Sequence, residues 1–590
     1  MHLKNHVGFL IMFLSTTILS QSFINDKSWL TYFEKSDFLE TPNYELTIDF
    51  FKRLDDNSNY GKLIKFGKTP QGRDLFVFAV SKEKKFTSND FRISNKPTIL
   101  IINGIHSGEI NGKDACMILL REILISKEKL DLINNVNLLV IPVFNVDGHE
   151  RASEYNRINQ IGPKKMGWRT TAQNYNLNRD FLKVDAPEMK YFLKLYSDYL
   201  PEILIDVHST DGADFQYHTT ITAEKNQNTT AIVADWTRNK FLPFIFNKVN
   251  EKGFLISPFV GFIKNDPKNG LRDWVASPRF SNGYAAAQNR VGMLIESHVR
   301  KSYKDRVYST KAVLESAIEY ANTNHSELKE MIEKSDEEAI EKYYLKKNPF
   351  PLSFNLSDKF DEYEFKGFEY EIKESQISGN KVKVFTQNRF SKKVPFYNYA
   401  EVDHSIKLPN SYLIPQEYQK FVDILKLHGV KVKQVNKMET WRGVKTKFKN
   451  ISFSKAPFES HFLPKYEIDE VKDITEIHEG DYLVDCQQRA IGVIAYLLEP
   501  SSDESFVKWG MMNEIFEQKE YFEDYAMEPI AERMYLNNQE LKNLFDKKIS
   551  SDSVFANNPY ERLNFFYQNS NYYDSHLNFY PIIKLIDKID

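Results

Sequence analysis

The sequence contains almost no cysteine and has almost no net charge. Cys116 and Cys486 are the only cysteines among 590 residues, which excludes a fold held together by disulfides. We expect these two to be buried free thiols rather than one bridge. The 78 lysine and arginine residues nearly balance the 81 aspartate and glutamate residues, leaving a net charge of -3. Nothing in this balance indicates a nucleic-acid-binding surface.

Sequence patterns of several common architectures and active sites are also missing. There is no internal repeat, heptad run or low-complexity tract. His149-Glu150 is followed by Ser153 where a His-Glu-x-x-His zinc motif requires its second histidine. The residues around Ser107 do not form the Gly-x-Ser-x-Gly turn of serine hydrolases. These two mechanisms of hydrolysis are therefore excluded.

One apolar run lies at the N-terminus. Lys4 and His6 precede the apolar residues 7–14, and the segment 15–20 ends in Ser20. The run is too short for a comfortable membrane span and has the organisation of a secretory signal peptide. We expect a signal peptide at 1–20 and a secreted or periplasmic protein with no stable membrane span after its removal. An uncleaved membrane anchor is the alternative.

Residues from Arg73 to about Arg300 alternate between short apolar runs and helical patterns. The apolar runs are expected strands, and they lie at residues 75–80, 98–102, 136–143, 202–207 and 291–295. Helical patterns between them lie at residues 114–125, 187–199 and 229–249. Such alternation predicts an α/β fold with a mixed, mainly parallel sheet flanked by helices.

The pattern changes after about residue 345. Residues 304–347 form one helical stretch rich in glutamate and lysine, which we expect to close the first domain. Alternating patterns at 366–372 and 381–385 predict half-exposed strands. The segment 506–590 is rich in aromatic residues, and its pattern predicts mostly helix. We therefore expect a first domain at 27–345 and a C-terminal α+β accessory region of unassigned role at 346–590.

Four polar clusters lie just beyond or between the expected strands, where ligands bind in open α/β sheets. They are His106-Ser107-Gly108-Glu109, the loop with Trp168-Arg169 and Asn178-Arg179, His208-Ser209, and Glu296. Two histidines and one glutamate are a ligand set of catalytic zinc. His106, Glu109 and His208 are thus candidate zinc ligands. A surface turn for the first two and a hydrogen-bonded core histidine for the third are the alternatives.

The other clusters supply one acid and two guanidinium groups. Glu296 ends an apolar strand, and burying a carboxylate costs several kcal/mol unless it is paired or protonated. It is a candidate general base, with a salt bridge to Arg290, Arg300 or Lys301 as the alternative. An arginine near a metal can stabilise an oxyanion, and another can hold a carboxylate through two hydrogen bonds. This combination indicates hydrolysis next to a free C-terminus.

In its motifs and their order, the chain resembles the M14 family of zinc metallocarboxypeptidases, the carboxypeptidase A-like group, over roughly residues 40–320. The resemblance implies one Zn²⁺ per chain, held by the three candidate ligands. It implies that residues 27–345 are a catalytic domain and that peptide or protein C-termini are the substrate. The other implied roles are general acid/base for Glu296, oxyanion stabiliser for Arg169, and clamp on the substrate C-terminus for Asn178 and Arg179.

The sequence departs from the pancreatic members of this family at several places, including a shorter interval between Trp168-Arg169 and Asn178-Arg179. Gly108 lies where they have arginine, and Asn176 lies where they have aspartate. No tyrosine occurs at the spacing of their closing tyrosine, so Tyr284 is the candidate substrate contact, with a core aromatic as the alternative. Residues 346–590 look like an extension found in some secreted bacterial members.

These observations predict a secreted zinc carboxypeptidase that hydrolyses C-terminal peptide bonds. An amidase or deacylase of the same fold, acting on N-acyl amino acids or cell-wall peptides, is the first alternative. A non-catalytic peptide- or glycan-binding protein is the second, although the complete ligand set and Glu296 argue against it. The sequence does not indicate the oligomeric state or the preferred terminal residue.

Overall fold

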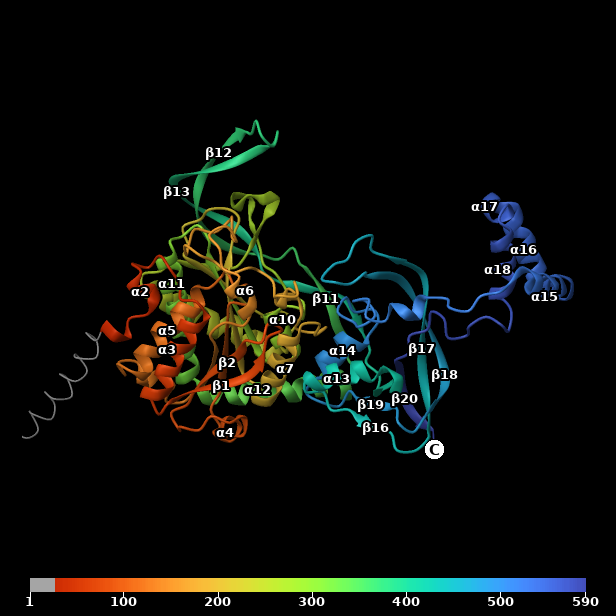
Figure 1. Ribbon diagram of the computed structural model, residues 1–590, viewed down its shortest axis with the longest axis horizontal. Coiled ribbons are helices and arrows are strands. Elements are labelled where there is room, and N and C mark those ends of the chain that lie inside the picture. Colours follow the sequence, from red (N-terminus) through yellow and green to blue (C-terminus); the bar gives the residue numbers. More distant parts are fainter. Residues whose placement is uncertain (1–26, 590) are drawn as a thin grey trace, which may run out of the picture.

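The computed structural model describes residues 27–589 (Figure 1), so the signal peptide expected at 1–20 lies outside the described residues. The first part of the chain is built on an eight-stranded sheet with strand order β1-β2-β4-β3-β5-β10-β6-β7. Its strands are β1 (Gly61–Lys68), β2 (Asp74–Val80), β3 (Thr98–Asn103), β4 (Asn137–Ile141), β5 (Ile203–Thr210), β6 (Thr219–Ala223), β7 (Ile256–Pro258) and β10 (Val291–His298).

The centre of this sheet is parallel and its flanks are partly antiparallel. Strand β3 pairs in parallel with β4 and β5, and β5 pairs in parallel with β10. Strands β1, β2 and β6 join through antiparallel pairs, whereas β7 is parallel to β6. The predicted α/β fold with a mixed sheet is therefore confirmed.

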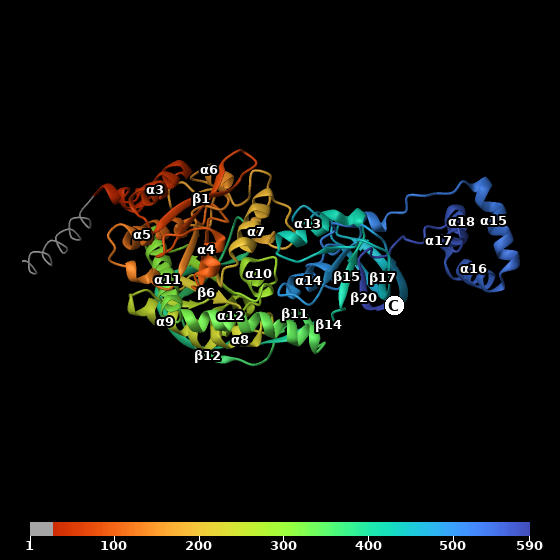
Figure 2. The same ribbon diagram turned by 90° about the horizontal axis from the view of Figure 1, so that it is seen from below.

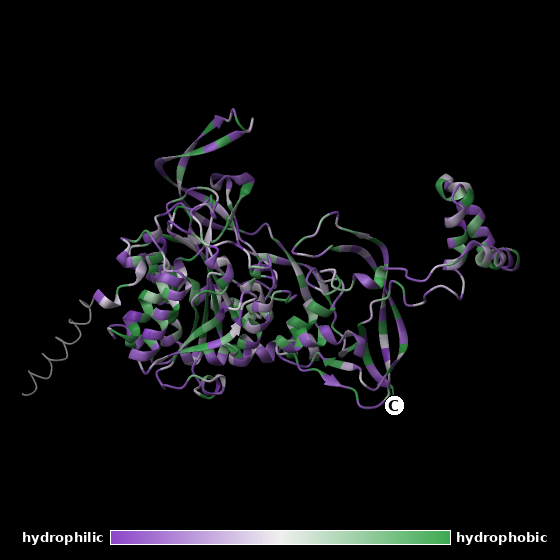
Figure 3. Cartoon of the chain, in the orientation of Figure 1, coloured by the Kyte–Doolittle hydropathy of each residue, from purple (hydrophilic) through white to green (hydrophobic). Residues whose placement is uncertain are grey.

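Helices cover both faces of the sheet, so the side chains of its central strands are buried at nearly every position. Ile99 and Ile101 point to one face of β3, and Leu100 and Ile102 point to the other, all four buried. The central strands have the hydrophobic colour in Figure 3, and the surface helices are mixed. Helices α3 (Tyr44–Asn57), α5 (Asn111–Leu124), α9 (Leu242–Glu251) and α11 (Tyr303–Thr323) cover the first face; α7 (Pro187–Tyr199) and α10 (Ser281–Ala287) cover the second.

The helical stretch expected at 304–347 is two α-helices rather than one. Helix α11 ends before Asn324, and α12 (His325–Ile340) begins directly after it. The Asn324 backbone is not helical (φ -108°, ψ 28°), and its side-chain amide donates a 2.9 Å hydrogen bond to the carbonyl of Tyr320. Asparagine side chains compete with helical hydrogen bonds in this way, which accounts for the break.

The first strands of the C-terminal region are attached to the first domain. Strand β11 (Phe350–Leu356) pairs with β14 (Ala400–Ile406), and the long hairpin of β12 (Asp361–Glu374) and β13 (Lys381–Tyr397) projects from the molecule. Strand β13 also pairs with the short β9 (Leu271–Arg272) of the first domain. The described residues contain no helix long and apolar enough to cross a membrane.

The remainder of the C-terminal region combines a second sheet with a separate helical module. The sheet has the order β16-β19-β15-β20-β17-β18. Its strands are β15 (Ser411–Ile414), β16 (Lys433–Gln434), β17 (Glu439–Phe453), β18 (Pro464–Ile477), β19 (Tyr482–Asp485) and β20 (Ile583–Ile589). The module consists of α15 (Asp524–Asn537), α16 (Gln539–Ser551), α17 (Ser553–Ala556) and α18 (Pro559–Gln568), has its own apolar cluster, and stands apart from the rest (Figures 1 and 2).

One apolar core is shared between the first domain and the C-terminal sheet. Helices α13 (Gln419–Leu427) and α14 (Ile491–Leu498) belong to the same buried cluster as α7 and α10. The cluster therefore continues across the expected boundary at residue 345. Two parts of a chain that share a large apolar interface of this kind do not behave as independent domains.

Deleting residues 346–590 should consequently leave a first domain that does not fold stably. The deletion exposes the apolar surface of α7 and α10 that α13 and α14 bury, and burial of each large apolar side chain contributes about 1.5–3 kcal/mol. We expect aggregation, or a thermal unfolding transition without cooperativity. A soluble truncated protein that melts as sharply as the full chain would contradict the shared core.

Candidate functional site

Three side chains that can bind a metal lie together at the carboxyl end of the central strands. His106 follows β3, Glu109 lies in the turn that leads into α5, and His208 belongs to β5. Because β3 and β5 are parallel neighbours, their ends meet at one edge of the sheet. All three residues are buried, and one ligand atom from each lies within 4.8 Å of the others.

Both imidazoles turn the same ring nitrogen toward the carboxylate of Glu109. Nδ1 of His106 is 3.3 Å from Oε1, and Nδ1 of His208 is 3.1 Å from Oε2. The backbone supports this arrangement, since the N–H of Glu109 donates to the carbonyl of His106 at 2.8 Å. The N–H of Ser209 donates to Oε2 of Glu109 at 3.0 Å.

Each imidazole has an acceptor behind its other nitrogen. Nε2 of His208 is 2.8 Å from Oδ2 of Asp206, and Nε2 of His106 is 3.1 Å from Oδ1 of Asn176. Such acceptors keep the proton on Nε2 and leave the lone pair of Nδ1 for a metal. Nδ1 of His106 is buried and has no hydrogen-bond partner in the described part of the chain. The donor set of zinc fits this arrangement, which offers the Nδ1 atoms of two histidines and the carboxylate of Glu109.

Burial and charge act in opposite directions at these three groups. Burial lowers the pKa of His106 to about 4. Burial also opposes the charged form of His208, but the carboxylates of Asp206 and Glu109 raise its pKa well above the usual range. Burial disfavours an ionised Glu109, yet its two histidine neighbours and Arg157 hold its pKa well below the usual range. An ionised carboxylate thus lies between the two imidazoles.

Glu296 lies beside this cluster and has no ion-pair partner among residues 27–589. Glu296 belongs to β10 and is in register with His208 on the neighbouring strand β5, so both side chains leave the same face of the sheet. Its Oε2 is buried without a hydrogen-bond partner, and burial raises the pKa of Glu296 to about 8. The basic residues considered as its partners pair elsewhere: Arg290 with Asp336, and Arg300 and Lys301 with Asp214.

The candidate arginines and Asn178 line the same cavity, whose volume is about 720 Å³. Nη1 of Arg169 is 3.5 Å from Oε1 of Glu109. The guanidinium of Arg179 lies 4.3 Å above the ring of Phe280 and donates to the backbone carbonyl of Asn178 at 2.7 Å. Burial lowers the pKa of Arg179, and the positive charge of Arg169 adds to that effect. The cavity therefore has a site for an anion next to the candidate metal ligands.

The remaining walls of the cavity are mixed, with Asp211, Arg272 and Asp273 beside a group of apolar side chains. Side chains from the first domain and from β11 contribute to them, so the C-terminal region forms part of the cavity. The apolar lining residues are Phe259, Val260, Trp274, Val275, Phe280, Leu294, Phe354 and Leu356.

Comparison with protein families identifies the fold and its chemistry. The family model of zinc carboxypeptidases, peptidase M14, matches residues 47–377, more than half of the chain. The chain belongs to this family. It is a metallocarboxypeptidase, a hydrolase that acts on peptide bonds. The resemblance found in the sequence is therefore confirmed.

Similar proteins include fungal and animal carboxypeptidases. Carboxypeptidase 2 of Trichophyton rubrum is 21% identical over 503 residues, which cover 81% of this chain and 85% of the fungal protein. Carboxypeptidase Z of Gallus gallus is 36% identical over 124 residues, which cover 20% of this chain and 17% of that protein. The alignment with the fungal enzyme is long enough to include much of the C-terminal region.

Solved structures of carboxypeptidases are similar to this chain over about half of its length. A putative carboxypeptidase A from Shewanella denitrificans has 17% identity and a TM-score of 0.37, covering 48% of this chain and 69% of that chain. Carboxypeptidase A from Helicoverpa armigera has 15% identity and a TM-score of 0.36, covering 48% of this chain and 74% of that chain.

A third arginine, Arg157, occupies the space beside Gly108. A Cβ atom on Gly108 would lie 2.6 Å from Cγ of Arg157 and 2.9 Å from the carbonyl of Gly167, so no side chain fits there. Nη2 of Arg157 donates to Oε1 of Glu109 at 2.5 Å, and Arg157 lines the cavity. Sequence reasoning missed this residue. The only signal was the glycine between two candidate ligands, which pointed to a missing contact rather than to its replacement.

Tyr284 is not part of the site. Its side chain is fully buried, with its hydroxyl 3.1 Å from Nδ1 of His428 and accepting a 2.8 Å hydrogen bond from Nε2 of Gln288. Its ring packs against Phe181 and Tyr196 in the shared apolar core. The expected substrate contact is therefore corrected to a core role, because α10 turns this side chain away from the cavity.

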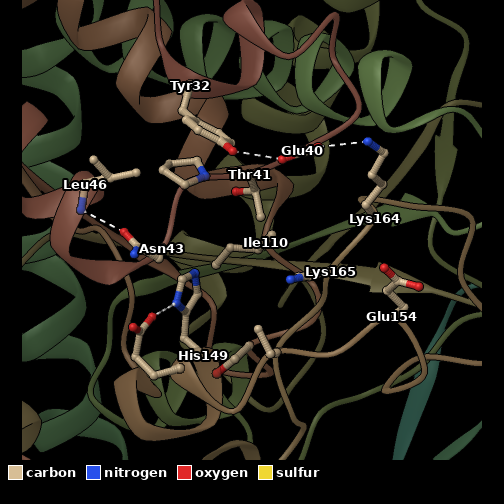
Figure 4. Close-up of a pocket in the computed structure, with 15 residues that line it drawn as sticks. Tyr32, Glu40, Thr41, Asn43, Leu46, Ile110, His149, Glu154, Lys164 and Lys165 are labelled. Carbon is tan, nitrogen blue, oxygen red and sulfur yellow. Dashed lines mark hydrogen bonds and ion pairs between the residues drawn. The ribbon is translucent and has the colours of Figure 1, made fainter.

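A second cavity, of about 470 Å³, is lined in part by Ser107 and Ile110, the sequence neighbours of His106 and Glu109, but shares no lining residue with the first. Figure 4 shows its lining residues. Glu40 accepts a 2.8 Å hydrogen bond from Tyr32 and pairs with Lys164 at 2.9 Å. His149 lies 2.7 Å from Glu150 in its wall. These charged groups satisfy one another, and no candidate zinc ligand reaches this cavity.

The core role of Tyr284 can be separated from a substrate contact by one substitution. Tyr284→Phe leaves Nδ1 of His428 without its donor inside the core, so it should lower the free energy of unfolding by about 1–3 kcal/mol. The kcat/KM for peptide hydrolysis should stay unchanged, because the side chain does not reach the cavity. Denaturant unfolding and steady-state kinetics measure both quantities. A raised KM with unchanged stability would restore the substrate contact.

Proposed function

We propose that this chain is a secreted zinc carboxypeptidase that releases residues from the C-termini of peptides and proteins. The observation that supports it is the convergence of three kinds of group on one cavity. These are the three ligand-type side chains, the unpaired carboxylate of Glu296, and the guanidinium groups of Arg169 and Arg179. A metal, an acid/base group and an anion site are the parts that hydrolysis beside a free carboxylate requires.

In this proposal His106, Glu109 and His208 hold the zinc ion. Zinc bound there would polarise the scissile carbonyl group and lower the pKa of water. Asp206 and Asn176 keep the protons of the two imidazoles on Nε2, so that both Nδ1 atoms remain ligands.

Glu296 moves the proton. Its unpartnered Oε2 accepts the proton of the attacking water and delivers it to the nitrogen of the leaving amine. Burial favours the protonated carboxyl, and a group that holds a proton easily near neutral pH suits both steps. Arg169 supplies positive charge beside the metal ligands, where the oxyanion of the tetrahedral intermediate develops.

Asn178 and Arg179 bind the terminal carboxylate of the substrate. Arg179 has no carboxylate within ion-pair distance among the described residues, and its guanidinium is held over the Phe280 ring. A planar guanidinium binds a carboxylate through two parallel hydrogen bonds. Asn178 lines the same cavity, and the N–H groups of its side-chain amide are donors that a carboxylate can accept.

The extent of the catalytic unit and its location follow from the sequence. We assign residues 27–345 to the catalytic domain and residues 346–590 to an accessory region that contributes Phe354 and Leu356 to the cavity wall. The signal peptide at 1–20 would direct the protein out of the cytoplasm.

Replacing Glu296 tests the acid/base role. Glu296→Gln should keep the fold and one zinc per chain but lower kcat by at least about 10²-fold, because glutamine cannot transfer the proton. Metal analysis and peptide kinetics measure the two effects. His208→Ala is the matched control, which should lose the zinc itself. Near-wild-type turnover of Glu296→Gln would remove this residue from the mechanism.

Peptides with amidated C-termini test the anion clamp. Amidation, or Arg179→Ala, should lower kcat/KM by roughly one to two orders of magnitude, since hydrogen bonds to charged groups contribute about 1.5–3 kcal/mol. The loss on amidation should largely disappear in the Arg179→Ala variant, because the group that senses the charge is gone. Equal cleavage of free and amidated peptides by the wild type would favour an endopeptidase or amidase instead.

A further inference from the structure

The two histidines of the proposed zinc site have unequal partners. His208 has the carboxylate of Asp206 behind it, whereas His106 has only the neutral amide of Asn176. A carboxylate behind a ligand histidine raises the basicity of its metal-binding nitrogen and fixes the ring. On its own, Asn176 can orient His106 but adds no negative charge.

The amide of Asn176 has a defined direction. Nδ1 of His106 faces Glu109, so the proton lies on Nε2 and Asn176 must accept it through Oδ1. The amide nitrogen then points the other way. It donates to Oε1 of Glu459, from the C-terminal region, at 3.4 Å, the long end of the hydrogen-bond range. A continuous path thus leads from the imidazole of His106 to a carboxylate.

Glu459 is held in an unfavourable backbone conformation. Phe458 and His461 bond to each other through both backbone N–H groups, at 2.9 and 3.1 Å, leaving Glu459 and Ser460 as a two-residue turn. Both turn residues have positive φ, 46° and 75°. Hairpin turns of this kind favour asparagine and glycine, and strained backbone of this sort is concentrated at functional sites.

The turn is anchored on both flanks. Nε2 of His461 lies 2.8 Å from Oδ2 of Asp185 in the catalytic domain. The ring of Phe458 stacks on the buried Trp509 with ring centroids 6.1 Å apart. These contacts fix the tip of the turn against the loop that contains Asn176. Burial and the charge of Arg169 lower the pKa of Arg179, and the negative charge of Glu459 opposes that shift.

We propose that Glu459 is a positioning residue for the zinc site, acting on His106 through Asn176. The accessory region thereby supplies the negative charge that position 176 lacks. The inference rests on the proposed function, because it requires His106 to be a zinc ligand.

The test moves the carboxylate along this path and measures zinc affinity. The zinc dissociation constant is determined by competition with a chelator for the wild type, Glu459→Gln, Asn176→Asp and the double variant. Glu459→Gln should raise it about tenfold, the lower end for the loss of an outer partner. The double variant should bring the dissociation constant back toward the wild-type value. Its carboxylate at position 176 would contact His106 directly, and its amide at position 459 could donate to that carboxylate. Asn176→Asp alone should bind more weakly than the double variant, because two carboxylates then face each other.

Three controls make the outcomes distinct. Glu479→Gln changes an exposed glutamate of the same region and should leave the dissociation constant unchanged. Thermal unfolding of each variant checks that the fold is kept. A wild type that binds no zinc, or a His208→Ala variant that binds it equally well, would overturn the proposed function. Two results would overturn only the role of Glu459. They are an unchanged zinc dissociation constant in Glu459→Gln, and a double variant that binds zinc as weakly as Glu459→Gln.

Discussion

The parallel pairing of β3, β5 and β10 is the constraint on which the rest of the site depends. It brings the end of β3, His208 and Glu296 to one edge of the sheet, although they are far apart in the sequence. Hydrogen bonding between neighbouring strands sets the spacing of these groups to that of adjacent strands. The helices on both faces and the shared apolar core serve to keep this edge rigid, as a site of this kind requires.

Much of this arrangement can be predicted from the sequence, because it depends on short-range patterns. Apolar runs at regular intervals predict the strands, and polar residues at their ends indicate the site. Residues whose role depends on distant contacts cannot be found in this way. Arg157 reaches the space above Gly108 from a separate loop, and Glu459 comes from another region. For Tyr284, the pattern does not tell that α10 is buried on every side and contributes no residue to the cavity wall.

The C-terminal region is better described as part of the enzyme than as an appendage. It shares an apolar core with the catalytic domain, adds Phe354 and Leu356 to the cavity, and brings a carboxylate to the back of Asn176. The helical module of α15 to α18 differs, since it has its own core and projects on two connecting segments of chain. Contacts made by that module would leave the geometry of the cavity unchanged.

The position of β20 has a consequence for how the protein is made. This strand lies inside the second sheet, between β15 and β17, although it follows the helical module in the chain. The ribosome therefore delivers an inner strand of that sheet after all of the other strands of the sheet. Until residues 583–589 emerge, β15 and β17 have unpaired edges facing each other, and the second sheet cannot close. Closure of the sheet that carries the Glu459 turn therefore waits for a strand that follows the helical module, although the turn itself lies well before that module in the chain.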